Sequence, residues 1–179
     1  MFPDDIVALA NEVLEAAKAR GIRIATAESC TAGLVSGALT AVSGSAEVVE
    51  RGFVTYSNEA KHEMLGVDAQ MVEDAGAVSE AVARAMAEGA LAHSNADLAV
   101  SITGIAGPKG GTPLKPVGLV HFATAMKGEP TQHRQELFGA LGRERVRLAS
   151  VKVALNLLWV RLNGVQAQPK PTSPPVERP

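Results

Sequence analysis

The stretch DLAVSITGI, residues 97–105, does most to decide the fold. It is almost continuously apolar, which is the pattern of a strand in a sheet that is covered on both faces. A Gly/Pro-rich segment, GPKGGTPLKP (107–116), follows it, and the apolar run 117–126 is predicted to be the next strand. We therefore expect a buried sheet at the centre of the protein.

Outward from this strand, helices and strands alternate along the chain. Apolar spacing and turn residues predict helices over 4–20, 30–42, 58–65 and 68–74, a longer helix that Ser79 caps, and strands over 22–26 and 48–56. Toward the C-terminus, a turn at 127–130 and a returning strand at 133–138 predict a hairpin, and a final helix spans 143–162. These elements predict one α/β domain over residues 1–165, a three-layer α/β/α sandwich with a mixed sheet.

Composition narrows the class of protein. The 179 residues carry a net charge of −2 and 3% aromatic residues, which argues against nucleic acid as a partner. The single cysteine, Cys30, leaves no internal disulfide and suits a reducing compartment. The N-terminus lacks signal-peptide features, and no uncharged apolar stretch is long enough to span a membrane. We expect a cytoplasmic protein without a membrane partner.

Two features lie at the C-terminal end. The final helix is apolar on more than one side around residues 155–160, which indicates deep burial or a subunit contact and favours a homo-oligomer. Residues 166–179 have almost no apolar side chains and are predicted to be disordered.

The segment TAESCTAG, residues 26–33, is the first candidate for chemistry. Ser29 lies where a predicted strand gives way to a helix, and it is either a helix N-cap or a nucleophile. Ala32 stands where a capping box would have Glu or Gln. In the catalytic interpretation, N–H groups at the helix start would stabilise the oxyanion. Cys30 is expected to be a buried small side chain rather than the nucleophile.

A base for Ser29 is not found among the four scattered histidines, which together with Cys30 also give no metal-ligand spacing. We expect neither a metal nor a cofactor. Lys61, in the first turn of the predicted helix 58–65, is a better candidate, because the helix dipole and partial burial both favour its neutral amine. On position alone, a solvated surface lysine is the more common role for Lys61. Tyr56, the single tyrosine, ends the preceding strand.

A third candidate is SITGIAGPKGG, residues 101–111, which leaves the buried strand and enters a glycine-rich turn. Ligands of α/β sheets tend to bind at such places, and glycines let backbone N–H groups approach a phosphate. The pattern is neither a P-loop nor GxGxxG, so a plain flexible loop explains it as well.

At these segments the sequence resembles the CinA C-terminal domain family, whose members with established activity are nicotinamide-nucleotide amidohydrolases. Matching blocks occur in family order over residues 5–163. They are AESCT (27–31), RGFVTYSNEAK (51–61), GAVSE (76–80), SITGIAGP (101–108) and KPVGLVHFA (115–123). Several long blocks in order are far more specific than any single motif.

The resemblance implies catalytic roles for three residues: Ser29 as nucleophile, Lys61 as general base and Tyr56 as a further hydroxyl. It implies nicotinamide mononucleotide (NMN) as substrate, hydrolysed to nicotinate mononucleotide and ammonia without a cofactor. The residues then expected to contact the substrate are Glu28, Thr31, Gly33, Ser101, Thr103, Gly104, Gly107 and Arg143. Arg143 is the expected phosphate partner, because its guanidinium has a fork of donors.

Three departures from the family pattern bear on activity. Ala32 replaces the usual second glycine, Lys109 replaces a residue that is commonly acidic, and the segment 138–143 is one residue longer and lacks the family's Asp. A non-catalytic nucleotide-binding module of the same fold is therefore an alternative. An amidohydrolase or esterase for another small substrate, or a structural interaction protein, are two others.

Overall fold

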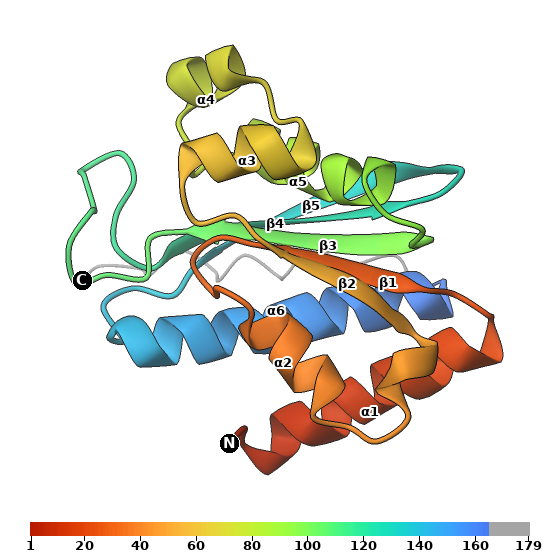
Figure 1. The fold of residues 1–179 in the computed structure, drawn as a ribbon. Coiled ribbons are helices and arrows are strands. Elements are labelled where there is room, and N and C mark those ends of the chain that lie inside the picture. The colour runs from red at the N-terminus through yellow and green to blue at the C-terminus, as the bar shows by residue number, and fades with distance from the viewer. Residues whose placement is uncertain (165–179) are drawn as a thin grey trace, which may run out of the picture.

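The computed structural model describes residues 1–164 as a five-stranded mixed sheet between two layers of helices (Figure 1). The strand order is β2-β1-β3-β4-β5. Strand β1 pairs in parallel with β2 and β3, whereas β4 pairs antiparallel with β3 and β5. The bounds are β1 (Ile24–Glu28), β2 (Val49–Val54), β3 (Leu98–Gly104), β4 (Leu119–Met126) and β5 (Glu129–Leu137). The predicted α/β sandwich with a mixed sheet is confirmed.

The helices divide between the two faces of the sheet (Figure 1). One face is covered by α1 (Asp4–Ala19), α2 (Leu34–Thr40) and α6 (Arg143–Asn163), and the other by α3 (Asn58–Leu65), α4 (Ala69–Ala75) and α5 (Glu80–Ala92). A short 3₁₀ helix, η1 (Ser45–Glu47), precedes β2. No helix among residues 1–164 is both long and apolar enough to cross a membrane.

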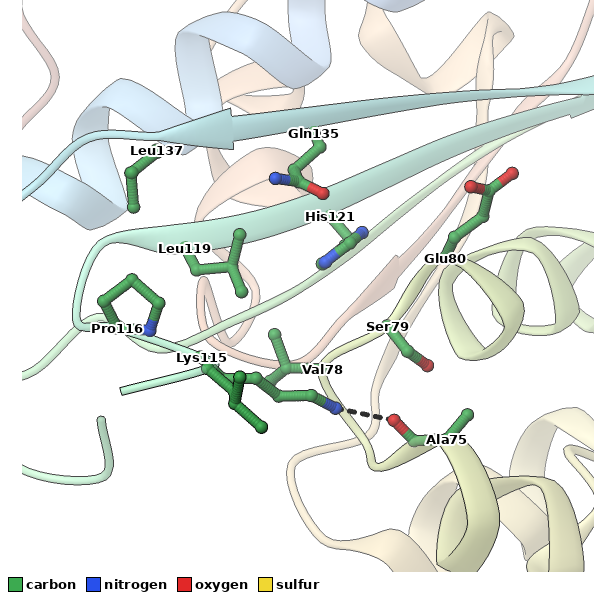
Figure 2. A pocket seen from close by; sticks show the side chains of 11 residues that line it. Ala75, Val78, Ser79, Glu80, Lys115, Pro116, Leu119, His121, Gln135 and Leu137 are labelled. Atoms are coloured by element: carbon green, nitrogen blue, oxygen red, sulfur yellow. Dashed lines mark hydrogen bonds between the residues drawn. The ribbon is translucent and has the colours of Figure 1, made fainter. Parts of the chain in front are cut away.

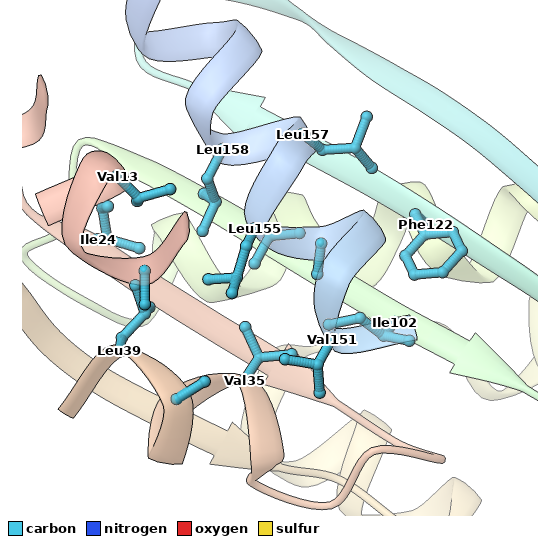
Figure 3. Packing of buried hydrophobic residues seen from close by; sticks show 14 of the residues in the cluster. Val13, Ile24, Val35, Leu39, Ile102, Phe122, Val151, Leu155, Leu157 and Leu158 are labelled. Carbon is cyan, nitrogen blue, oxygen red and sulfur yellow. The ribbon is translucent and has the colours of Figure 1, made fainter. Parts of the chain in front are cut away.

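Successive side chains of the strands alternate between two hydrophobic cores, one on each face of the sheet. In β3, Leu98, Val100 and Ile102 point into the core beneath α6, whereas Ala99 points into the core beneath α5. Figure 3 shows the first of these cores, where Val151, Leu155 and Leu158 of α6 gather with side chains of α1, α2 and the sheet. A strand buried on both faces needs no polar alternation, which is why the segment 97–105 is almost continuously apolar.

The apolar breadth of α6 is accounted for within one chain. Val146, Val151, Leu155 and Leu158 are fully buried, and Leu157 is 7% exposed. Deep burial therefore explains the leucines of this pattern, whereas Trp159 and Val160 are only partly buried. The expectation of a homo-oligomer stays a prediction. The predicted disorder of residues 166–179 lies outside the described residues.

Two predicted boundaries near Ser29 are wrong. The first strand runs two residues further, to Glu28, and α2 begins at Leu34 rather than at Cys30. The intervening turn contains Ala32 and Gly33 with φ of 49° and 90°, and a right-handed helix cannot pass through two left-handed residues. Because of this turn, Ser29 lies outside α2.

Candidate active site

Ser29 extends β1 by one residue. Its backbone N–H donates to Ile102 O at 2.9 Å, so the residue keeps the direction of the strand. Successive side chains of a strand point to opposite faces. Ala27 faces the core beneath α5, Glu28 turns toward α2, and Ser29 points back toward the α3 side. The interpretation of Ser29 as the N-cap of α2 is excluded, because the cap position is Gly33.

Glu28 performs the capping instead, from within the strand. Its fully buried carboxylate accepts the backbone N–H groups of Gly33, Val35 and Ser36 at 2.9–3.0 Å. These are the amides that the start of α2 leaves without intrahelical partners. The carboxylate is therefore committed to the helix, and the expectation that Glu28 contacts a substrate is not supported. The N–H groups of Gly33, Val35 and Ser36 are likewise occupied and are not available to an oxyanion.

Lys61 lies beside Ser29. Its side chain leaves the first turn of α3, is only 1% exposed, and places Nζ 3.3 Å from Ser29 Oγ. Nζ also donates to Thr55 O at 3.0 Å and to Ser57 O at 3.3 Å. A neutral amine has two N–H bonds and one lone pair. With both N–H bonds directed to carbonyl oxygens, the lone pair is left for the hydroxyl proton of Ser29.

The surroundings of Lys61 favour this neutral form. Burial lowers its pKa from the ordinary value of 10.5, and a thiolate at Cys30 and the carboxylate of Glu59 would oppose the shift. Burial also raises the pKa of the Cys30 thiol to about 12, so at neutral pH this thiol carries no charge that would stabilise an ammonium. No carboxylate pairs with Lys61 within residues 1–164. Ser29 and Lys61 thus have the geometry of a nucleophile and its base.

Tyr56 is placed differently from Lys61. Its side chain is 58% exposed, and its hydroxyl accepts a hydrogen bond from Arg143 Nη2 at 3.0 Å. Arg143 also donates to Gly107 O at 3.2 Å. Among the described residues, Tyr56 makes no hydrogen bond with Ser29. Tyr56 and Arg143 therefore form a polar pair on the exposed surface, where an anionic group of a ligand can reach the guanidinium.

Arg147 is a residue that the sequence analysis did not identify. It lies one helical turn after Arg143 on α6, and its guanidinium donates to Cys30 O at 3.1 Å and to Thr31 O at 2.9 Å. The spacing i, i+4 puts both arginines on one face of the helix, which was the available signal. Which loop this face meets is a property of the tertiary structure alone.

Most of the other residues that were predicted to contact the substrate instead make hydrogen bonds or packing contacts within the protein. Ser101 Oγ donates to Ala83 O at 2.6 Å, and Thr103 Oγ1 donates to Ala77 O at 2.7 Å, so these hydroxyls attach α5 and the segment before it to β3. A Cβ at Gly104 would meet Leu119 O at 2.9 Å, and one at Gly107 would meet Val117 Cγ1 at 2.5 Å. Close packing against the start of β4 therefore explains both glycines without a phosphate.

Thr31 and Gly33 belong to the turn itself. The Thr31 side chain is fully buried, and its hydroxyl has no hydrogen-bond partner within the part of the chain that the structure describes. Gly33 donates its N–H to Glu28, and its φ of 90° favours glycine. Both residues shape the segment that follows Ser29, and their expected contact with a substrate stays a prediction.

A separate cavity of about 430 Å³ lies on the α5 face of the sheet (Figure 2). Its lining comes from the segment 75–80, the segment 114–116, and β4 and β5, and none of Ser29, Tyr56 and Lys61 contributes to it. His121 borders the cavity, and its Nδ1 lies 3.0 Å from Nε2 of His133. The dashed line in Figure 2 is the bond from Lys115 Nζ to Ala75 O, which holds two of the lining segments together.

Fold and site together define an α/β protein with a serine–lysine pair at the carboxyl end of a parallel strand. A model of the CinA C-terminal domain matches residues 6–162, and the chain belongs to this family. The nicotinamide-nucleotide amidohydrolase PncC of Escherichia coli K12 is 48% identical over 159 residues, which cover 89% of this chain and 96% of that protein. A CinA-like protein of Mycolicibacterium vanbaalenii is 53% identical over 144 residues, or 34% of its length.

Two solved structures are similar to this chain over most of its length. The competence/damage inducible protein CihA from Agrobacterium tumefaciens has a TM-score of 0.88 and 49% identity, and covers 91% of this chain and 98% of its own. The competence damage-inducible protein ComA from Klebsiella pneumoniae has a TM-score of 0.85 and 39% identity, with coverage of 90% and 99%.

Proposed function

We propose that this protein is a nicotinamide-nucleotide amidohydrolase that converts NMN to nicotinate mononucleotide and ammonia. The observation that carries the proposal is the contact of 3.3 Å between Lys61 Nζ and Ser29 Oγ, made by a buried lysine whose N–H groups have other acceptors. The substrate is taken from the E. coli relative, which is 48% identical over 96% of its length and bears this activity in its name.

Acylation begins when Ser29 Oγ attacks the carboxamide carbon and Lys61 takes the hydroxyl proton. The tetrahedral intermediate then breaks its C–N bond, and protonated Lys61 gives the proton to the leaving nitrogen, so ammonia departs. A water attacks the resulting ester with Lys61 again as base, and the proton returns to Ser29 Oγ as nicotinate mononucleotide leaves. One lysine thus serves both half-reactions, as one histidine does in a Ser-His-Asp triad.

The positive ring of NMN suits an uncharged base. A pyridinium near Lys61 adds a like charge, which further disfavours the ammonium form. The same ring withdraws electrons from the amide and makes its carbon a better electrophile. On the exposed surface, the Arg143 guanidinium has the charge and the donor geometry to bind the phosphate of NMN. Tyr56 orients this guanidinium through the hydrogen bond between the two side chains.

Ammonia release from NMN tests the proposal. We expect the parent to release ammonia, Ser29→Ala to fall to background, and Lys61→Met to lose about 10²–10⁴-fold in kcat, the usual contribution of a general base. Ser43→Ala and Lys127→Met are matched controls, because both residues are exposed and neither forms a hydrogen bond with Ser29 or Lys61. A protein that binds NMN but releases no ammonia would instead be a binding module.

The covalent step has a test of its own. Hydroxylamine intercepts an acyl-enzyme ester and yields the hydroxamate in place of the acid, with Ser29 regenerated. We expect the hydroxamate of nicotinate mononucleotide with the parent and none with Ser29→Ala. Normal ammonia release from Ser29→Ala would exclude this mechanism, and activity on another amide with none on NMN would exclude the substrate.

A further inference from the structure

Two backbone N–H groups directly after Ser29 are not used in the hydrogen bonds of the turn. Ala32 N donates to Ser29 O at 3.1 Å and Leu34 N donates to Thr31 O at 3.3 Å, which close two successive turns. Apart from the contact between the Cys30 N–H and its own thiol, the N–H groups of Cys30 and Thr31 have no acceptor among residues 1–164. They are the amides next in the chain after Ser29 and are not consumed by Glu28.

Arg147 fixes the direction of the Thr31 amide. A trans peptide is planar, and its C=O and N–H point in opposite directions. The bond from Arg147 Nε to Cys30 O draws that carbonyl toward α6, so the Thr31 N–H of the same peptide points away from α6. The second bond, from Nη2 to Thr31 O, holds the next peptide. Two bonds from one rigid fork prevent this turn from rotating.

From these contacts we infer that Arg147 is a positioning residue for an oxyanion site made by the backbone N–H groups of Cys30 and Thr31. The inference rests on the proposed function, because an oxyanion forms on the carboxamide oxygen only when Ser29 attacks. Arg147 touches neither substrate nor nucleophile in this scheme. Its positive charge on the Cys30 carbonyl also polarises the Cys30–Thr31 peptide, which makes the Thr31 N–H a stronger donor.

Glu28 and Arg147 act on the same turn in complementary ways. Glu28 accepts from the N–H groups at the start of α2, and Arg147 donates to the carbonyl groups before it. Side chains therefore hold the turn at its carbonyl groups and at the start of α2, and neither of them occupies the N–H groups of Cys30 and Thr31. Preorganised donors of this kind stabilise developing charge without rearrangement during the reaction.

The test uses the full chain and steady-state hydrolysis of NMN by the parent, Arg147→Met, Arg147→Lys and the control Arg145→Met. Arg145 is an exposed arginine two residues away on the same helix. We expect Arg147→Met to lose about 10²–10³-fold in kcat, as removal of an oxyanion donor does, with KM within about threefold. Arg147→Lys should be intermediate, because an ammonium cannot hold both carbonyls in the same way. Arg145→Met should match the parent.

Two readouts separate positioning from mere stability. NMN affinity, measured in the Ser29→Ala background by calorimetry, should be unchanged by Arg147→Met, and added methylguanidinium should restore part of the kcat of Arg147→Ala. If Arg147→Met does not fold, Arg147→Lys, with its conserved charge and stem, decides. A parent-like kcat in a folded Arg147 variant, or a loss confined to KM, overturns the inference.

The proposed function fails in a different way. If the parent releases no ammonia from NMN, or if Ser29→Ala remains active, the amidohydrolase itself is wrong. If the parent is active, Ser29→Ala is inactive and Arg147→Met keeps the parent kcat, only the role of Arg147 is wrong.

Discussion

The proton on Lys61 decides whether Ser29 can be activated, since only the neutral amine can accept the hydroxyl proton. Because burial lowers the Lys61 pKa below 10.5, we expect kcat/KM for NMN to rise with pH along a limb whose midpoint lies below that value. The residual activity of Lys61→Met should lack this limb. Rates measured from about pH 5 to about pH 10 test the expectation, and a midpoint at or above the ordinary value would contradict it.

Ala32 is the single non-glycine residue with positive φ among the described residues. An L-residue in this conformation costs about 1–2 kcal/mol, part of which glycine returns through greater freedom of the unfolded chain. We expect Ala32→Gly to raise the free energy of unfolding by up to about 1 kcal/mol. Urea denaturation measures the change.

Ala41→Gly is the control for Ala32→Gly. Ala41 is exposed and has an ordinary φ of −67° at the end of α2. The same substitution there should lower stability by roughly 0.5–1 kcal/mol. Equal effects of the two changes would show that the left-handed conformation of Ala32 carries no strain.

At the scale of elements, two side chains at the carboxyl end of β1 lie on opposite faces of the sheet. Glu28 caps α2 on one face, and Ser29 meets Lys61 of α3 on the other. A shift of one residue in the register of β1 would exchange these directions, because the side-chain period of a strand is two. The parallel bonds of β1 to β2 and β3 therefore fix the site as firmly as any side chain does.

The hairpin of β4 and β5 carries a titrating pair. Burial lowers the pKa of both His121 and His133 below 6.5. The positive charges of Lys115, near His121, and Arg84, near His133, lower these pKa values further. The carboxylate of Glu80 opposes the shift at both rings. Below 6.5 the unfolded chain therefore binds protons that the folded chain does not. Stability should fall as the pH drops from about 6.5 through the folded pKa values.

The double variant His121→Gln/His133→Gln should lose part of this pH dependence. Urea denaturation of parent and variant on either side of pH 6.5 measures the difference in slope. Identical slopes in the two proteins would mean that the pair contributes nothing to acid destabilisation. Activity need not change, because neither histidine contacts Ser29 or Lys61 in the structure.

At the scale of the whole molecule, the two cores share the strands that separate them. Alternate residues of β1 and β3 enter the core beneath α6 and the core beneath α5, so loss of one core exposes the other face of the same strands. We expect residues 1–165 to unfold as one cooperative domain. Far-UV circular dichroism and the fluorescence of Trp159, the single tryptophan, should give coincident transitions. Separate midpoints would divide the chain into independent units.

Much of the fold follows from local sequence pattern. The boundaries of α3 and the start of α6 were predicted to the residue, and β3 followed from its apolar run. The start of α2 was not, because Ala32 gives no sign in the sequence of its left-handed conformation and because Glu28 supplies the cap from a strand. For the glycine-rich turn, the sequence left a phosphate site and a plain flexible loop open, and packing against β4 accounts for Gly104.

By itself the sequence determined the layers, the mixed sheet and the identity of Ser29 and Lys61 as the pair to examine, because periodicity, turn residues and family motifs are local properties of the chain. Only the tertiary structure decided that Lys61 Nζ lies 3.3 Å from Ser29 Oγ, that Tyr56 pairs with Arg143, and that Arg147 holds the turn after Ser29. These contacts join residues 32, 87 and up to 117 positions apart. Burial and direction across such separations come from the packing of α3 and α6 against the sheet edge, which no local pattern encodes.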